Sequence, residues 1–280
     1  MTLTGLFVPL ITPFTEDDHV DTAALTALAH NALTAGATGL LALGTTAEPA
    51  TLTPRERATI LAICQEAATE HHAPLLIGAG TNSTRATAQA LKDLPEGTAA
   101  ALVPVPPFTR PSPAGVIAHF QAIACHVPLI VYNVPHRTGT TLTAETLHRL
   151  ASVPGVVGTK NSLVAIDTDT VAFMAAKPAD FSVLAGDDVM LAPLLALGAD
   201  GGILASAHLR TSDFADLIAR PGRGHHLATL SAALFAEPNP AVIKAVLHER
   251  GEIATPAVRL PLLPASDTAL ARARSALALP

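Results

Sequence analysis

The sequence has few of the residues that mark several large classes of protein. It contains two cysteines, Cys64 and Cys125, whose spacing fits neither a metal site nor a disulfide framework. We expect both to be free, buried thiols in helices, in a reducing cytoplasm. The 17 basic residues include only four lysines, form no basic run and leave a net charge of −6. This composition argues against nucleic acid or an anionic membrane as a partner.

Long apolar segments and a targeting signal are also missing. No window approaches the roughly 20 consecutive apolar residues of a membrane span, although 49% of the residues are hydrophobic. The apolar segment at residues 6–11 has no basic residues before it, and acidic residues follow it at 16–18. We interpret this segment as a first strand, not as a signal peptide. The sequence therefore predicts a cytoplasmic protein with a large core.

Short apolar runs recur along the chain, with segments of helix length between them. Eight runs lie at residues 6–11, 39–43, 74–77, 99–105, 128–132, 156–160, 181–185 and 201–205. Helix starts lie between them, as at Thr53, where Pro54 and Glu56 complete a capping pattern. Eight strand–helix units predict an α/β fold, a closed (β/α)8 TIM barrel. A doubly wound open sheet is the alternative, but its glycine-rich nucleotide motif is missing.

The last part of the chain continues beyond the eighth run. Segments at 211–219, 224–235, 240–249 and 266–279 have the pattern of helices. The first of them would complete the barrel. We expect residues 1–222 to form the catalytic barrel and residues 223–280 to form a C-terminal helical extension packed on it.

Two scarce residues end neighbouring strands of the predicted barrel. Lys160 ends the sixth run, and Tyr132, the only tyrosine, ends the fifth. TIM-barrel enzymes carry their active sites at these strand ends. An amine shielded from water is a nucleophile for carbonyl groups, and a phenol beside it can move the protons that imine formation requires. No metal-binding set of residues accompanies them. The two residues therefore predict carbonyl chemistry through an imine.

Three motifs in this order resemble those of the dihydrodipicolinate synthase / N-acetylneuraminate lyase family. They are Gly44-Thr45-Thr46-x-Glu48, Tyr132-Asn133-Val134-Pro135-x-Arg137-Thr138-Gly139 and Gly158-x-Lys160. Members of that family are class I, pyruvate-dependent aldolases on a (β/α)8 barrel with a C-terminal helical extension. The resemblance extends from about residue 5 to residue 250, and it also implies a homotetramer built as a dimer of dimers.

The resemblance implies three catalytic residues and no cofactor apart from the covalent imine. Lys160 would form the imine with the ketone of pyruvate. Tyr132 would donate and accept protons during imine and enamine formation. Thr45 would hydrogen-bond Tyr132 and orient it, which a hydroxyl can do as donor and acceptor at once.

The resemblance also implies the residues that bind the substrates. Thr46 and nearby backbone N–H groups would hold the carboxylate of pyruvate, and Gly186 and Ile203 would line the pyruvate end of the pocket. Arg137 would grip the carboxylate of an incoming aldehyde, aspartate semialdehyde, through a bidentate contact. The expected reaction is a condensation like that of 4-hydroxy-tetrahydrodipicolinate synthase. Alternatives are an aldolase or dehydratase for a 2-keto-3-deoxy sugar acid, or a catalytically impaired relative that binds keto acids.

The most serious departure from the family pattern lies at residue 108. The family usually has a second tyrosine after the fourth strand, contributed across a dimer interface to a proton relay, and Phe108 stands there in this chain. Phenylalanine fills the space but carries no proton. Three explanations remain open: a slow synthase, a relay through a water or another group such as His136, or a different substrate.

Overall fold

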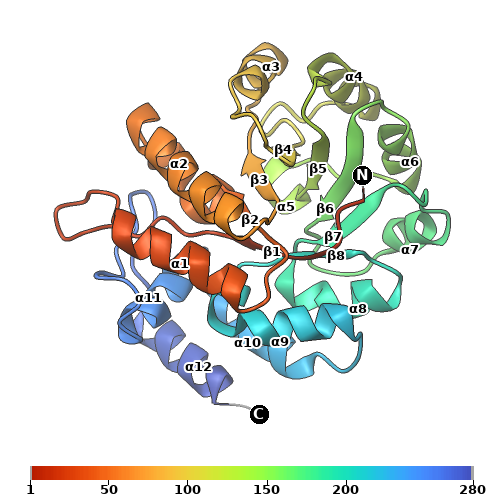
Figure 1. Ribbon diagram of the computed structural model, residues 1–280. Coiled ribbons are helices and arrows are strands. Elements are labelled where there is room, and N and C mark those ends of the chain that lie inside the picture. Colours follow the sequence, from red (N-terminus) through yellow and green to blue (C-terminus); the bar gives the residue numbers. More distant parts are fainter. Residues whose placement is uncertain (1, 279–280) are drawn as a thin grey trace. The chain divides into compact units, whose positions relative to one another are not determined.

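The computed structural model describes residues 2–278 and contains a closed barrel of eight parallel strands, in the order β1 to β8 (Figure 1). The strands are β1 (Gly5–Pro9), β2 (Gly39–Ala42), β3 (Leu75–Gly78), β4 (Ala100–Pro104), β5 (Leu129–Asn133), β6 (Val156–Asn161), β7 (Ser182–Ala185) and β8 (Gly201–Ile203). Each overlaps one of the eight apolar runs of the sequence, with ends that differ by up to two residues. The predicted (β/α)8 barrel is therefore confirmed.

Helices alternate with these strands and also follow the last one. The α-helices are α1 (Thr22–Thr34), α2 (Pro54–Glu70), α3 (Thr84–Lys92), α4 (Pro113–Ile123), α5 (Pro135–Thr138), α6 (Ala144–Ala151), α7 (Thr168–Ala175), α8 (Leu191–Ala196), α9 (Ala207–Ala219), α10 (His225–Leu234), α11 (Ala241–Glu249) and α12 (Asp267–Leu277). Short 3-10 helices are η1 (Thr45–Ala47), η2 (Pro49–Thr51) and η3 (Asp188–Met190).

Local sequence explains where these elements form. All four residues of β2 and of β7 are buried, as expected for parallel strands covered on both faces. At the start of α2, the Thr53 side chain accepts from the Glu56 N–H while the Glu56 carboxylate accepts from the Thr53 N–H. This reciprocal capping box satisfies two backbone donors that a helix start leaves unpaired.

The described residues form two compact units. The first unit contains residues 2–5 and Leu76–Ile203, and the second contains Leu6–Leu75 and residues 204–278. In the first unit, α3, α4, α6 and α7 follow one another along the outside of the strands (Figure 1). Its core contains the edge-to-face pair Phe173 and Phe181, whose ring centroids are 5.8 Å apart.

The second unit joins the C-terminal helices to the first helix of the chain. Buried side chains from α10, α11 and α12 form one cluster with Leu28 of α1 and Leu209 of α9. The expected helices after residue 222 are thus present, and within this unit they pack on helices that follow barrel strands. Residues 279 and 280, in and just beyond the last predicted helix, lie outside the described residues. The division of the chain at residue 222 stays a prediction.

Two local predictions are wrong. Cys64 is buried in α2, but Cys125 lies beyond the end of α4 and is only partly buried, because the chain leaves the helix at Ala124 to enter β5. The last barrel helix starts at Ala207, before the expected residue 211, and it has a kink at Arg210, where φ is −147° and ψ is 49°.

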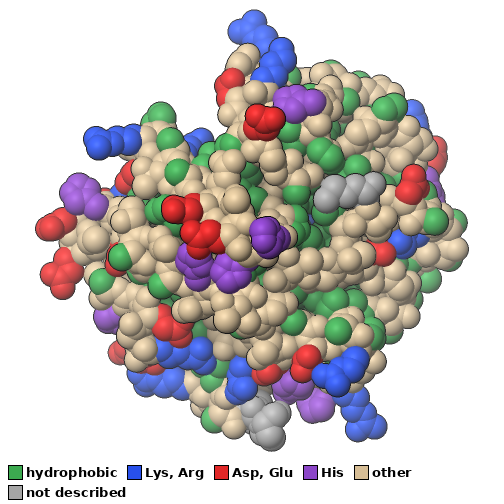
Figure 2. Space-filling model, in the orientation of Figure 1, with side chains coloured by type: hydrophobic (Ala, Val, Ile, Leu, Met, Phe, Trp, Pro, Cys, Tyr) green, Lys and Arg blue, Asp and Glu red, His purple; other side chains and the backbone are tan. Residues whose placement is uncertain are grey.

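Charge is thinly spread on the surface. Figure 2 shows lysine and arginine side chains of the described residues in small, separate groups on the face in view, as expected from 17 basic residues in 280. Among the described residues, no helix is both long enough and apolar enough to cross a membrane.

Candidate active site

The amine of Lys160 lies against the ring of Tyr132. The two residues are direct partners in the register of β5 and β6, so both side chains leave the sheet on the same side. Lys160 Nζ is 4.7 Å from the centroid of the Tyr132 ring, and only 7% of the lysine is exposed. The structure therefore brings together the two residues on which the sequence prediction depends.

Gly186 leaves the space that the Lys160 side chain occupies. A Cβ atom at residue 186 would lie 2.5 Å from Lys160 Cγ and 2.7 Å from Lys160 Cε, far closer than real Cβ contacts. The same atom would lie within 2.2 Å of Ser162 Oγ. Any larger residue would displace the lysine stem, so glycine is a steric requirement here.

A buried polar layer flanks the Lys160 strand. Asn161 accepts a hydrogen bond of 2.9 Å through its Oδ1 from the side-chain amide of Asn133, and the Ser162 N–H donates to the Asn133 carbonyl. The Ser162 hydroxyl is buried and has no hydrogen-bond partner among the described residues. These contacts fix the end of β6 on β5. Asn133 belongs to the motif that begins at Tyr132, but the motif did not predict its contact with Asn161.

Arg137 and His136 stand on the short helix α5, directly after β5. Both are exposed, and Asp187 after β7 is close enough to affect His136 electrostatically. The protein around His136 shields part of its ring from water, and this is the main cause that lowers the pKa of His136. The Arg137 cation lowers it further, and Asp187 opposes both effects. Burial raises the pKa of Asp187. Arg137 therefore presents a guanidinium to solvent at the end of the strand that carries Tyr132, as a carboxylate-binding residue requires.

Phe108 points into solvent from the loop after β4. Its exposed fraction is 87%, and its backbone φ is 68°, a left-handed value that is uncommon for a bulky residue. In the same loop, Arg110 lies over Gly139 at the end of α5, where an added Cβ would come within 3.0 Å of Arg110 Nε. The loop that carries Phe108 therefore contacts the end of α5, the helix that carries Arg137. Phe108 itself is not packed within the described chain.

Of the remaining predicted residues, Ile203 and Thr46 are buried and Thr45 is half-buried. Ile203 ends β8 in the first unit and is fully buried. Thr45 and Thr46 form the start of η1 in the second unit, directly after β2. Thr46 is 4% exposed, and its Oγ1 accepts a hydrogen bond of 2.9 Å from Asn239 Nδ2. We call residues 44–48 the threonine turn.

The sequence model of the dihydrodipicolinate synthetase family matches residues 2–278 of this chain. The chain belongs to the dihydrodipicolinate synthetase family. The predicted family and the predicted class of enzyme are thereby confirmed.

Relatives of this family member resemble it over nearly their whole length. The 4-hydroxy-tetrahydrodipicolinate synthase of Phocaeicola vulgatus is 38% identical, over 98% of this chain and 96% of its own. Synthase 2 of Clostridium acetobutylicum is 34% identical, over 95% and 96%. The crystal structure of the Acinetobacter baumannii dihydrodipicolinate synthase in complex with pyruvate superposes with a TM-score of 0.91, at 34% identity, over 99% of this chain and 98% of that one.

A buried charged cluster in this family member supports the threonine turn. The Lys244 ammonium, from α11, donates to Glu48 Oε1 at 2.5 Å and to the Ala257 carbonyl at 2.7 Å. The Arg259 N–H donates to Glu48 Oε2 at 2.8 Å. Sequence reasoning missed Asn239 and Lys244. A lysine inside the otherwise apolar run of α11 was the one available signal, because such a residue needs a buried partner.

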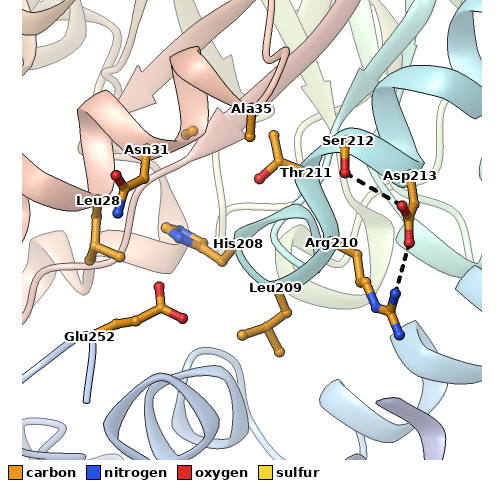
Figure 3. Close-up of a pocket in the computed structure, with 11 residues that line it drawn as sticks. Leu28, Asn31, Ala35, His208, Leu209, Arg210, Thr211, Ser212, Asp213 and Glu252 are labelled. Atoms are coloured by element: carbon orange, nitrogen blue, oxygen red, sulfur yellow. Dashed lines mark hydrogen bonds and ion pairs between the residues drawn. The ribbon is translucent and has the colours of Figure 1, made fainter. Parts of the chain in front are cut away.

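A separate pocket of about 280 Å³ lies within the second unit and contains none of the predicted site residues. Asn31 of α1, His208 of α9 and Glu252 line it (Figure 3). Burial lowers the pKa of His208 to about 4, so its ring is neutral at pH 7. Its Nε2 lies 3.2 Å from the Ile11 nitrogen and 3.1 Å from the Pro9 carbonyl oxygen, and the tautomer of the ring decides whether it accepts from the first or donates to the second. Among the described residues, no group of three or more histidine, cysteine or acidic side chains could hold a metal ion.

Proposed function

We propose that this chain is a pyruvate-dependent, lysine Schiff-base synthase that condenses pyruvate with aspartate semialdehyde, as 4-hydroxy-tetrahydrodipicolinate synthases do. The observation that carries the proposal is the buried Lys160 amine, 4.7 Å from the ring of Tyr132 at the ends of β5 and β6. The relatives named as synthases support the reaction, and the pyruvate complex of the Acinetobacter baumannii enzyme supports the first substrate.

The proposed reaction starts with attack of the Lys160 amine on the ketone carbon of pyruvate. A C–N bond forms, the former ketone oxygen leaves as water, and the imine remains on Lys160. Tyr132 supplies the proton that this oxygen needs and takes part in the later removal of a methyl proton that gives the enamine. The enamine carbon then forms the new C–C bond with the aldehyde carbon, which restores the imine on Lys160. The amino group of aspartate semialdehyde attacks the imine carbon, the C–N bond to Lys160 breaks, and ring closure frees the lysine amine without a cofactor or a metal.

The other predicted residues take supporting roles in this proposal. Thr45 orients the Tyr132 hydroxyl, and Thr46 with nearby backbone N–H groups binds the pyruvate carboxylate. Gly186 and Ile203 form the pyruvate end of the pocket. The requirement for glycine at residue 186, where the Lys160 stem lies, supports this arrangement.

Trapping with sodium borohydride tests the proposed chemistry. Incubation with pyruvate and borohydride is expected to reduce the imine to a stable adduct, which peptide mass spectrometry assigns to Lys160. Assays with aspartate semialdehyde, short aldehydes and 2-keto-3-deoxy sugar acids then identify the second substrate. Turnover of a sugar acid alone would favour the aldolase or dehydratase alternative, and an adduct without any turnover would indicate an impaired keto-acid-binding relative.

Arg137→Ala is expected to raise KM for aspartate semialdehyde by about ten- to a hundredfold, since hydrogen bonds to a charged group contribute about 1.5–3 kcal/mol. Steady-state kinetics at saturating pyruvate measure this change. Arg137→Lys keeps the charge but loses the bidentate fork. Its KM for aspartate semialdehyde is expected to lie between that of the unaltered protein and that of Arg137→Ala. An unchanged KM in Arg137→Ala would remove the main support for aspartate semialdehyde as the substrate.

We further propose that the chain forms a homotetramer as a dimer of dimers and acts in the cytoplasm. An apolar side chain that is 87% exposed on a left-handed backbone is well suited to burial against a second copy of the chain. One structural relative is described as a monomeric dihydrodipicolinate synthase variant, so sedimentation analysis is the direct test of this assembly.

Phe108→Tyr is expected to raise kcat if a second copy places residue 108 next to Tyr132. The new hydroxyl would restore a proton relay, and general acid–base assistance contributes about a hundredfold or more in favourable cases. Phe108→Leu, which adds no hydroxyl, serves as the control. An unchanged kcat in Phe108→Tyr would show that no second copy places residue 108 next to Tyr132, or that another group or a water already moves the proton.

A further inference from the structure

Asn239 connects the C-terminal extension to the threonine turn. It lies just before α11 and is 8% exposed. Its Nδ2 is 2.9 Å from Oγ1 of Thr46, although the two residues are 193 positions apart in the chain. An amide nitrogen donates hydrogen bonds and accepts none. The Thr46 oxygen is therefore the acceptor in this contact.

The orientation of the Asn239 amide agrees with this direction. Its Oδ1 is buried and has no hydrogen-bond partner among the described residues. The opposite orientation would leave a buried NH2 group without an acceptor, and orphaned N–H groups are rarer than orphaned carbonyl oxygens in proteins. With its oxygen engaged by Asn239, Thr46 keeps its own hydroxyl hydrogen for another acceptor.

Other contacts hold the backbone of the threonine turn. The Thr12 hydroxyl donates to the Ala47 carbonyl at 2.8 Å, and Lys244 with the Arg259 N–H holds the carboxylate of Glu48. The turn is therefore anchored by several contacts besides that of the Asn239 side chain. What depends on Asn239 is the direction in which the Thr46 hydroxyl hydrogen points.

We propose that Asn239 is a positioning residue that fixes the Thr46 hydroxyl as a hydrogen-bond donor to the carboxylate of the keto acid. This inference rests on the proposed function, in which Thr46 binds that carboxylate. A carboxylate accepts hydrogen bonds only, so a threonine set to donate binds it better than one whose hydrogen is directed elsewhere.

Asn239→Asp is the sharpest test, because it keeps the shape of the side chain and replaces the donor by an acceptor. The Thr46 hydroxyl would then donate to residue 239. The pyruvate concentration that half-saturates borohydride trapping at Lys160 is expected to rise by about ten- to a hundredfold. In contrast, the fold-change in kcat at saturating pyruvate should be several times smaller than the fold-change in half-saturation. Asn31→Asp, at an exposed residue of α1 in the same unit, is the control for the added charge and should leave half-saturation unchanged.

Two further variants separate positioning from a structural role. Asn239→Ala frees the Thr46 hydroxyl to rotate and should raise half-saturation by less than Asn239→Asp does. In a Thr46→Val background, which has no hydroxyl to direct, Asn239→Ala should add no further change. If circular dichroism shows that Asn239→Asp does not fold, the Asn239→Ala variant, with and without the Thr46 hydroxyl, tests the positioning role of Asn239.

The outcomes are distinguishable from failure of the proposed function. No adduct in the unaltered protein would overturn the proposed function and this inference together. An adduct in the unaltered protein, with the same half-saturation in folded Asn239→Asp or Asn239→Ala, would overturn the inference alone. An equal effect of Asn239→Ala with and without the Thr46 hydroxyl would also overturn it.

Discussion

Lys160→Ala is expected to form no borohydride-stable adduct with pyruvate and to lose activity by about ten-thousand-fold or more, equivalent to roughly 5.5 kcal/mol of transition-state stabilisation. The loss is large because the amine forms the covalent bond on which the later steps depend. The chain has only three other lysines, Lys92, Lys177 and Lys244. Of these, Lys177 is paired with Asp200 and Lys244 with Glu48.

Two variants control this experiment. Lys92→Ala removes an exposed lysine of α3 and should keep both the adduct and the activity. Lys160→Arg keeps a cation at the site but has no amine that forms an imine, so it should be as inactive as Lys160→Ala. Pyruvate-dependent labelling of a different lysine, or substantial activity in Lys160→Ala, would contradict the assignment.

Lys244→Met is expected to lower the free energy of unfolding by about 3–5 kcal/mol, the cost of breaking a buried ion pair from one side. The Lys244 side chain is fully buried, and that of Glu48 is 1% exposed. The ammonium also lies 4.1 Å from the centroid of the Phe14 ring. Burial lowers the pKa of Lys244 to about 8, with Glu48 opposing the shift, so the amine is still mostly cationic at pH 7. Its removal leaves the Glu48 carboxylate buried without its cation.

Denaturant unfolding of three variants separates the charge effect from lost packing. Glu48→Gln combined with Lys244→Met removes both charges and should recover much of the stability. Arg220→Met breaks a pair with Asp216 whose side chains are 80% and 70% exposed, and it should change stability by less than about 1 kcal/mol. A double variant as unstable as Lys244→Met would show that packing, and not the unpaired charge, causes the loss.

Local sequence patterns were sufficient to predict the barrel and to place Lys160 and Tyr132 together in the candidate site. Strands covered on both faces appear in the sequence as short apolar runs, so all eight could be placed. Lys160 and Tyr132 end two of those runs, and their pairing follows from the register of neighbouring parallel strands. Thr45 and Thr46 likewise lie shortly after the end of a strand, β2.

Contacts between distant parts of the chain could not be predicted in this way. Asn239 and Lys244 reach the threonine turn across 193 and 196 residues, and no spacing rule connects such positions. Backbone conformation was equally invisible: the left-handed φ of Phe108 and the kink at Arg210 depend on the surrounding loops. The exit of Cys125 from its expected helix has the same origin, since the chain must turn there to reach β5.

The two units have a consequence for the order in which the protein is completed on the ribosome. The first unit is almost one continuous stretch, Leu76–Ile203, whereas the second combines the beginning of the chain with its end. The unit that contains Lys160 and Tyr132 is thus fully synthesised while the second still lacks α9 to α12. Glu48 precedes Lys244 by 196 residues in the chain, so the ion pair between them cannot form until α11 has been synthesised. Burial of the threonine turn is therefore one of the last events in the making of this protein.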